Sequence, residues 1–162
     1  MGVIQITLIF LALMQREYER WSGELDEMVE SHARMTRDEL AQALALSLEK
    51  RERLLKLLSM NHFDMEENSR YENLVEFKKA YGESIRAVGR CLDKFCPEMN
   101  KRDKEEFLYV YFPFMYGIYP YAVVTEKQRK AMEDAGVGFV YPSVYELSYN
   151  CLKKLLVKGE SQ

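Results

Sequence analysis

Histidine and cysteine are scarce in this chain of 162 residues, which has two histidines and three cysteines. The histidines lie far apart and no CxxC pair occurs, so the sequence contains no zinc-binding pattern. Cys91, Cys96 and Cys151 are therefore expected to be reduced core thiols of a cytoplasmic protein. The phosphate-binding patterns GxGxxG and GxxxxGK[ST] are also missing. We expect neither a metal nor a cofactor.

Positive charge is not in excess, because the formal net charge is −3 and the sequence pI is about 5.6. Duplex binding is driven by cationic patches, so nucleic acid is not expected to bind this chain directly. The basic groups at 50–56 and 101–104 alternate with acidic residues, which is typical of a solvated mixed-charge face. Glu66 and Glu67, near Asp64, could form a carboxylate pair, but the segment is polar and is expected to be an exposed loop. We therefore do not expect an enzyme.

Alternating strand patterns of useful length are absent as well, whereas three- and four-residue apolar spacing runs through most of the chain. The sequence predicts an all-α fold with six or seven helices in a single domain over residues 1–162. Side chains able to form capping boxes mark four helix starts. These pairs are Thr36 with Glu39, Asn100 with Asp103, Thr125 with Gln128, and Ser143 with Glu146.

The apolar amino-terminal segment MGVIQITLIFLALM could be a secretory signal, but no basic residue precedes it and no small-residue cleavage site follows it. We expect a helix from about Ile6 to about Ser31 instead.

Residues 36–58 are predicted to form either one helix or two. Asn61 to Ser69 is predicted to be a connection, and 71–95 a long helix with a seven-residue seam of the kind that packs antiparallel helices. That helix is expected to stop at Pro97.

The stretch from Phe107 to Thr125 has no charged residue, and it contains five Tyr and three Phe. On a helix its apolar residues cover two sides, so the stretch needs covering on both. A partner subunit, a bound ligand, or burial at the centre of one domain would each provide this. Pro113 and Pro120 interrupt the stretch and its tyrosines are spread along it, which argues against a membrane span. Gly117 and Pro120 are expected to end the helix.

Several segments together resemble the carboxy-terminal domain of the TetR family of tetracycline-repressor-like transcriptional regulators. The resemblance covers about residues 10–158. It is carried by FLALMQREYERW at 10–21, TRDELAQALALSLEKRERLLKLL at 36–58, EENSRYENLVEFKKAY at 66–81, FLYVYFPFMYGIYPYA at 107–122 and the helix that follows SVYE at 143.

The resemblance implies a regulator whose amino-terminal helix-turn-helix binds operator DNA, and whose carboxy-terminal domain holds a small ligand and dimerises through its last two long helices. Here those helices are 101–119 and 143–158. The segment MGVIQITLI resembles no part of a recognition helix, so the DNA-binding head is expected to be absent from this chain. This chain alone is then expected not to bind an operator.

A homodimer interface is expected on the second apolar sides of the last two helices. Its predicted residues are Phe107, Val110, Phe114, Ile118, Tyr141, Tyr145, Tyr149, Leu152 and Leu156. A small hydrophobic or aromatic effector is expected between the first, long and central helices. The predicted lining residues are Trp21, Phe63, Phe77, Tyr81, Tyr111, Met115 and Tyr119. The alternative is an interaction module that dimerises without a ligand and interferes with an intact regulator.

Overall fold

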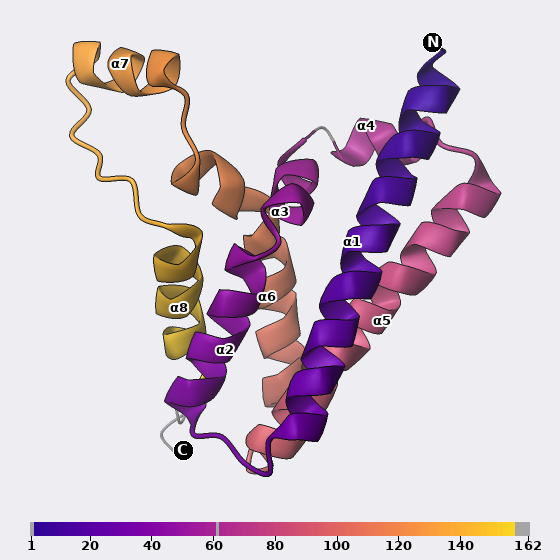
Figure 1. The fold of residues 1–162 in the computed structure, drawn as a ribbon, viewed down its shortest axis with the longest axis vertical. Coiled ribbons are helices and arrows are strands. Elements are labelled where there is room, and N and C mark those ends of the chain that lie inside the picture. Colours follow the sequence, from indigo (N-terminus) through magenta and orange to yellow (C-terminus); the bar gives the residue numbers. More distant parts are fainter. Residues whose placement is uncertain (1, 61, 158–162) are drawn as a thin grey trace.

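The computed structural model describes residues 2–60 and 62–157, and within them the chain forms eight α-helices and no strand (Figure 1). The all-α prediction is therefore confirmed. The helices are α1 (Val3–Ser31), α2 (Arg37–Glu49), α3 (Glu52–Ser59), α4 (His62–Glu67), α5 (Tyr71–Phe95), α6 (Lys101–Ala122), α7 (Glu126–Asp134) and α8 (Val144–Leu155).

The predicted helix starts are confirmed, because α2, α6, α7 and α8 each begin with the expected capping box. In each box the cap side chain accepts from the third backbone N–H of the helix, and the third side chain accepts from the cap backbone. Helix α7 ends just before Gly136, which has a φ of 71°, a conformation that glycine adopts readily. The neighbouring Val137 donates a backbone hydrogen bond to the Met132 carbonyl, which closes the helix.

Two boundaries differ from the sequence prediction, and a third is one that the sequence left open. Residues 36–58, predicted as one helix or two, form two, since the helix breaks at Lys50 and Arg51. The predicted connection between Asn61 and Ser69 contains the short helix α4, which is why the structure has one helix more than expected. The central helix α6 continues through Pro113 and Pro120 to Ala122. Both prolines lie on the exposed side of α6, where water can bond the carbonyls that a proline leaves free.

Among the described residues, helices α1 and α5 form the most extensive helix–helix contact. The pair runs in the same direction, which corrects the antiparallel packing predicted from the seam of α5 (Figure 1). Thr7 near the start of α1 bonds the carbonyl of Asn68 just before α5, at 3.4 Å. Asp26 near the end of α1 holds Arg90 near the end of α5 through two hydrogen bonds of 2.9 and 3.0 Å. A seven-residue spacing of apolar residues indicates that a helix packs along its length against another helix, but it does not indicate the direction of that second helix.

The core lies where α6 passes between the α1–α5 pair and the α2–α8 pair (Figure 1). Trp21 is fully buried there and its indole N–H donates to Ser47 Oγ at 2.9 Å. Its ring contacts the rings of Tyr111 and Phe112, with centroids 6.3 and 5.9 Å away. The stretch predicted to be central is therefore central, with one side in the core.

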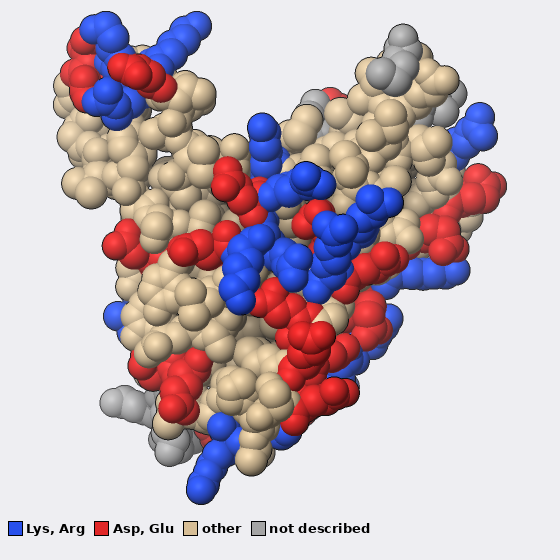
Figure 2. All heavy atoms as spheres, viewed as in Figure 1, with Lys and Arg blue, Asp and Glu red and all other residues tan. Residues whose placement is uncertain are grey.

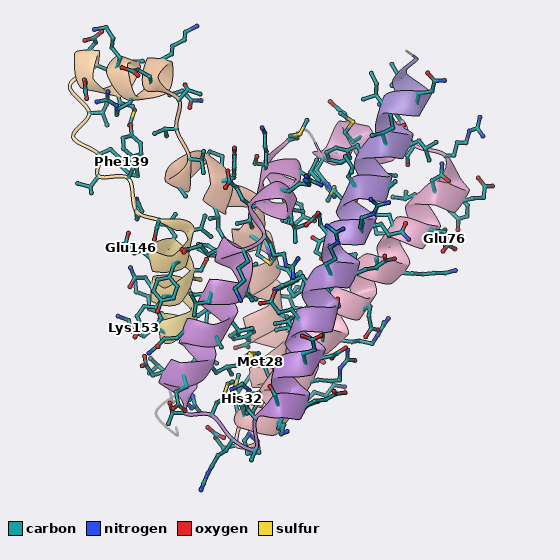
Figure 3. The ribbon with its side chains drawn as sticks, viewed as in Figure 1. Met28, His32, Glu76, Phe139, Glu146 and Lys153 are labelled. Atoms are coloured by element: carbon teal, nitrogen blue, oxygen red, sulfur yellow. The ribbon has the colours of Figure 1, made fainter. Side chains whose placement is uncertain are left out.

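Helix α7 lies apart from the other helices at the upper left of Figure 1 and buries no residue. The segment that returns from α7 to α8 carries Phe139, which Figure 3 labels, and Val140, which is 87% exposed. Phe139 contacts the rings of Tyr121 and Tyr141, with centroids 6.0 and 5.0 Å away. Residues 121–142, here called the α7 arm, thus have an aromatic base and a solvated tip.

No individual helix in the described part of the chain combines the length and hydropathy of a membrane span. Taken together, α6 and α7 reach that length and composition, but they meet at a bend of 81°.

Candidate ligand-binding site

A polar cluster lies among the aromatic side chains of α1, α4, α5 and α6. His62 and Glu66 are one turn apart on α4, and the His62 Nε2 atom is 2.6 Å from the Glu66 Oε1 atom. The Lys78 Nζ atom of α5 is 2.7 Å from the same oxygen. Because α4 is short and joined directly to α5, it holds the carboxylate against the first turns of that helix. A single carboxylate oxygen thus accepts from two donors.

Aromatic rings surround this cluster on several sides. The His62 ring lies 5.1 Å from the Tyr116 ring, 6.0 Å from Phe77 and 6.4 Å from Phe10. Tyr18 adds edge contacts from α1, 5.6 Å from Tyr81 and 6.0 Å from Phe77. We call His62, Glu66, Lys78 and these five rings the His62 cluster. Its members are Phe10, Tyr18, Phe77, Tyr81 and Tyr116 in addition to the polar three.

Burial dominates the electrostatics of the His62 cluster. It raises the pKa of Tyr18 well above its ordinary value and that of Tyr116 to about 12, so both phenols are neutral. Burial also lowers the pKa of His62, against the opposing effect of Glu66, and therefore favours the neutral imidazole. Lys78, at 44% side-chain exposure, is the most open of the three polar groups and marks the solvent side of the cluster.

Two buried polar atoms of the cluster have no hydrogen-bond partner in the described part of the chain, the Tyr18 hydroxyl oxygen and the Nδ1 atom of His62. Since Nε2 lies against a carboxylate, we assign the proton of the neutral ring to Nε2, which makes Nδ1 an acceptor. A buried acceptor without a donor is uncommon in proteins and costs about 1–3 kcal/mol. A hydrogen-bond donor that enters among the rings would therefore find the Nδ1 atom of His62 without another partner.

The residues predicted to line a pocket are only partly brought together. Phe77 and Tyr81 belong to the His62 cluster, and Tyr81 contacts the Phe112 ring at 5.8 Å. Trp21, Tyr111 and Met115 lie deeper, fully buried in the core around Phe112, and Tyr119 is half-buried against that core. Phe63 is 76% exposed, and no ring contact joins it to the cluster among the described residues.

The sequence analysis missed His62 and assigned Glu66 to an exposed loop, which is wrong, because Glu66 is on a helix with 22% of its side chain exposed. A histidine followed four residues later by a glutamate is a pair that meets on one helix face, so the signal was present. It was hidden because the six residues of α4 carry no apolar period that indicates a helix.

The nine residues predicted for a dimer interface divide into two sets. Within the single chain, Val110 is 48% exposed, and Phe114, Tyr141, Tyr145 and Tyr149 are half-buried. The remaining four are buried in the core of the same chain and have no face left for a partner. These four residues are Phe107, Ile118, Leu152 and Leu156.

Tyr145 and Tyr149 also have contacts of their own on the α2 side of α8. Their rings stack with centroids 5.7 Å apart, and the Tyr149 hydroxyl donates to Asp38 at 2.5 Å. The Lys153 ammonium lies 5.2 Å from the Tyr149 ring, and Figure 3 labels Lys153 on α8. These two tyrosines are therefore oriented toward α2, while the exposed side of α6 carries Tyr109 and Val110.

Basic and acidic side chains alternate across the face shown in Figure 2, where blue groups lie beside red ones. Lys50 and Arg51 pair with Glu24 of α1 at 3.2 and 2.8 Å, and Arg53 lies 3.9 Å from Glu17. Two carboxylates of α1 thus face three of the basic residues at 50–56, which lie on a mixed-charge face as the sequence pattern predicts. Among the described residues, no three His, Cys, Asp or Glu side chains gather in a way that could hold a metal ion.

These features describe an all-helical domain with an aromatic cluster beneath a short helix and one long helix through its centre. The sequence profile of the tetracyclin repressor-like C-terminal domain matches residues 15–144. The chain belongs to that family, whose members are transcriptional regulators. No protein of the curated set and no solved structure gives a significant match to this chain.

Proposed function

We propose that this domain binds a small effector at the His62 cluster and that, in an intact cytoplasmic regulator, this binding controls the attachment of a DNA-binding domain to its operator. The observation that carries the proposal is the buried, unpartnered Nδ1 atom of His62 inside a cluster of aromatic rings. Pockets for small molecules are mostly apolar and aromatic with a few placed polar groups, which is the composition of this cluster.

The same cluster explains how an effector could change the domain. Its side chains come from α1, α4, α5 and α6, so a molecule that enters among them contacts four helices at once. A ligand shifts an equilibrium between two helix arrangements only if it binds one of them better. Contacts to four separate helices provide that differential affinity.

A thermal-shift screen of a library of small aromatic and hydrophobic compounds tests the ligand proposal. Compounds that bind at the cluster raise the Tm of the wild type. They lose affinity in Tyr116→Phe, which keeps the ring and removes the hydroxyl. The matched control is Tyr121→Phe on the same helix, because Tyr121 is 57% exposed and its ring contacts Phe139 of the α7 arm, not the cluster. If no compound raises the Tm, or if every hit binds Tyr116→Phe as tightly as the wild type, the proposed site is wrong.

We further propose that the domain forms a homodimer through the exposed side of α6, where Tyr109, Val110 and Phe114 lie, together with the adjoining side of α8. Exposed apolar side chains in a row are typical of a subunit interface. Light scattering across a dilution series tests this. A mass near twice 19.1 kDa supports the dimer, and a mass of 19.1 kDa at every concentration contradicts it.

A further inference from the structure

Besides the Tyr18 hydroxyl, which can donate or accept a hydrogen bond, the His62 cluster offers groups that only accept or attract positive charge. Glu66 is an anionic acceptor with 22% of its side chain exposed, and Nδ1 of His62 is a neutral acceptor. The faces of Phe77 and Tyr81 carry the negative side of the ring quadrupole. Each of these groups attracts a positive charge or accepts a proton from a donor. Together they favour a ligand that is cationic and carries N–H groups.

A cation already occupies this position from within the chain. The Lys78 ammonium lies 5.4 Å from the centre of the Phe77 ring and 5.3 Å from that of Tyr81. The same ammonium is 2.7 Å from Glu66 Oε1. Lys78 thus shows that a primary ammonium fits between two ring faces and a carboxylate. Its side chain is 44% exposed and flexible, so it can turn into solvent at little cost.

We propose that the effector is a protonated amine carried on an aromatic or apolar body, whose ammonium replaces that of Lys78 at Glu66. A separate N–H or O–H group of the effector donates to His62 Nδ1, which the Lys78 ammonium does not reach. This inference rests on the proposed ligand site and names its ligand class. The apolar body packs against the rings of Tyr18 and Tyr116.

The same geometry disfavours other ligands of equal size. A carboxylate would meet Glu66, the lone pair of Nδ1 and two ring faces, and it would have to separate Lys78 from Glu66. A quaternary ammonium would keep the cation–π attraction but has no N–H for either acceptor. A neutral alcohol can donate a hydrogen bond to one acceptor, and the ion pair between Glu66 and Lys78 then stays intact.

Four probes that share a phenethyl body separate these cases by calorimetric titration of the whole chain at neutral pH. They are phenethylamine, trimethylphenethylammonium, phenethyl alcohol and hydrocinnamate. Phenethylamine is expected to bind most tightly and hydrocinnamate most weakly. Because a hydrogen bond to a charged group contributes about 1.5–3 kcal/mol, the amine should exceed the alcohol by at least about tenfold in affinity.

Two variants test the roles assigned to the charged residues. Glu66→Gln should reduce phenethylamine affinity by at least about tenfold, and it should leave phenethyl alcohol affinity nearly unchanged. Lys78→Met should increase phenethylamine affinity several-fold, since it removes the tethered competing cation. The matched control is Lys79→Met, because Lys79 pairs with Glu76 on the outer side of α5 and should leave the affinity unchanged. Figure 3 labels Glu76 on that side.

A gain of affinity on removing a positive charge is expected only if Lys78 and the ligand compete for one site. If Lys78→Met weakens amine binding, or if hydrocinnamate or the alcohol binds at least as tightly as the amine, the amine inference is wrong while a ligand site at the cluster stands. If none of the four probes binds the wild type or Lys78→Met, the amine inference is overturned. The library screen with Tyr116→Phe then decides separately on the proposed function.

Discussion

At the scale of single residues, the core depends on a few buried polar contacts as well as on apolar packing. The hydrogen bond from Trp21 Nε1 to Ser47 Oγ is buried and joins α1 to α2. The Ser47 hydroxyl in turn donates to the Leu44 carbonyl at 2.7 Å, which fixes its orientation toward the indole. Removing this hydroxyl would leave a buried N–H without an acceptor.

Ser47→Ala is therefore expected to lower the free energy of unfolding by about 1–3 kcal/mol, the usual cost of an unsatisfied buried donor. Urea denaturation followed by Trp21 fluorescence measures this. Ser31→Ala is the control, because that hydroxyl is exposed and bonds only its own helix and His32. A loss below about 0.5 kcal/mol in Ser47→Ala would show that water or another group replaces the serine.

The buried imidazole of His62 makes stability depend on pH. Its pKa is lowered below the ordinary value of 6.5, mainly by burial, so the unfolded chain binds a proton more readily than the folded one. The stabilisation is present above pH 6.5 and is lost as pH falls through the folded-state pKa. We expect the free energy of unfolding to decrease as the pH falls below 6.5, and His62→Gln to reduce this decrease.

The exposed His32 provides the control for this measurement, because His32→Gln should keep the wild-type pH dependence. Denaturant unfolding at several pH values gives the comparison. An equal decrease in the wild type and His62→Gln would mean that carboxylates, not His62, determine the pH dependence in this range.

At the scale of helices, the sequence predicted where helices begin better than it predicted which helices and residues pack together. Capping boxes such as those of Thr36 and Ser143 are local hydrogen-bond patterns, so four residues suffice to recognise them. The direction of α1 relative to α5 and the pairing of Glu66 with Lys78 depend on residues far apart in the chain, which no local spacing records. Leu152 shows the same limit, since its position in the sequence fits contact with a second subunit as well as burial in the core of one chain, where the structure places it.

The contrast between α6 and α7 gives a prediction about caps. Asn100→Ala should lower global stability by about 1 kcal/mol, because α6 is a core helix. Thr125→Ala removes an equivalent cap from α7, which buries no residue, so it should speed amide exchange within α7 and leave global stability unchanged. Denaturant unfolding and hydrogen exchange measure the two effects. Equal global losses in both variants would mean that α7 is packed in solution.

At the scale of the whole molecule, surface and core positions on the last two long helices should respond differently to a charge. Val110→Asp is expected to keep the fold and reduce the mass from near twice 19.1 kDa to 19.1 kDa, because Val110 is 48% exposed on the proposed interface. Leu152→Asp places a charge in the core of one chain, and the cost should be on the order of 3–5 kcal/mol of stability.

Circular dichroism separates loss of the fold from loss of the dimer in these two variants, and light scattering gives the mass. Val140→Asp on the exposed α7 arm is the control for the added charge and should remain dimeric. A dimeric Val110→Asp would place the interface elsewhere on the molecule.

The straight, 29-residue helix α1 has a mechanical consequence. Near its carboxyl end Asp26 is fastened to Arg90 by two hydrogen bonds, and the rings of Phe10 and Tyr18 lie farther along it at the His62 cluster. At about 1.5 Å per residue, the distance from Asp26 to Val3 is about 35 Å, so a tilt of roughly 5° about the fastened end moves the other end by about 3 Å. A molecule wedged beside Tyr18 that tilts α1 in this way would therefore also strain the hydrogen bond from Thr7 to the Asn68 carbonyl near the other end of the helix.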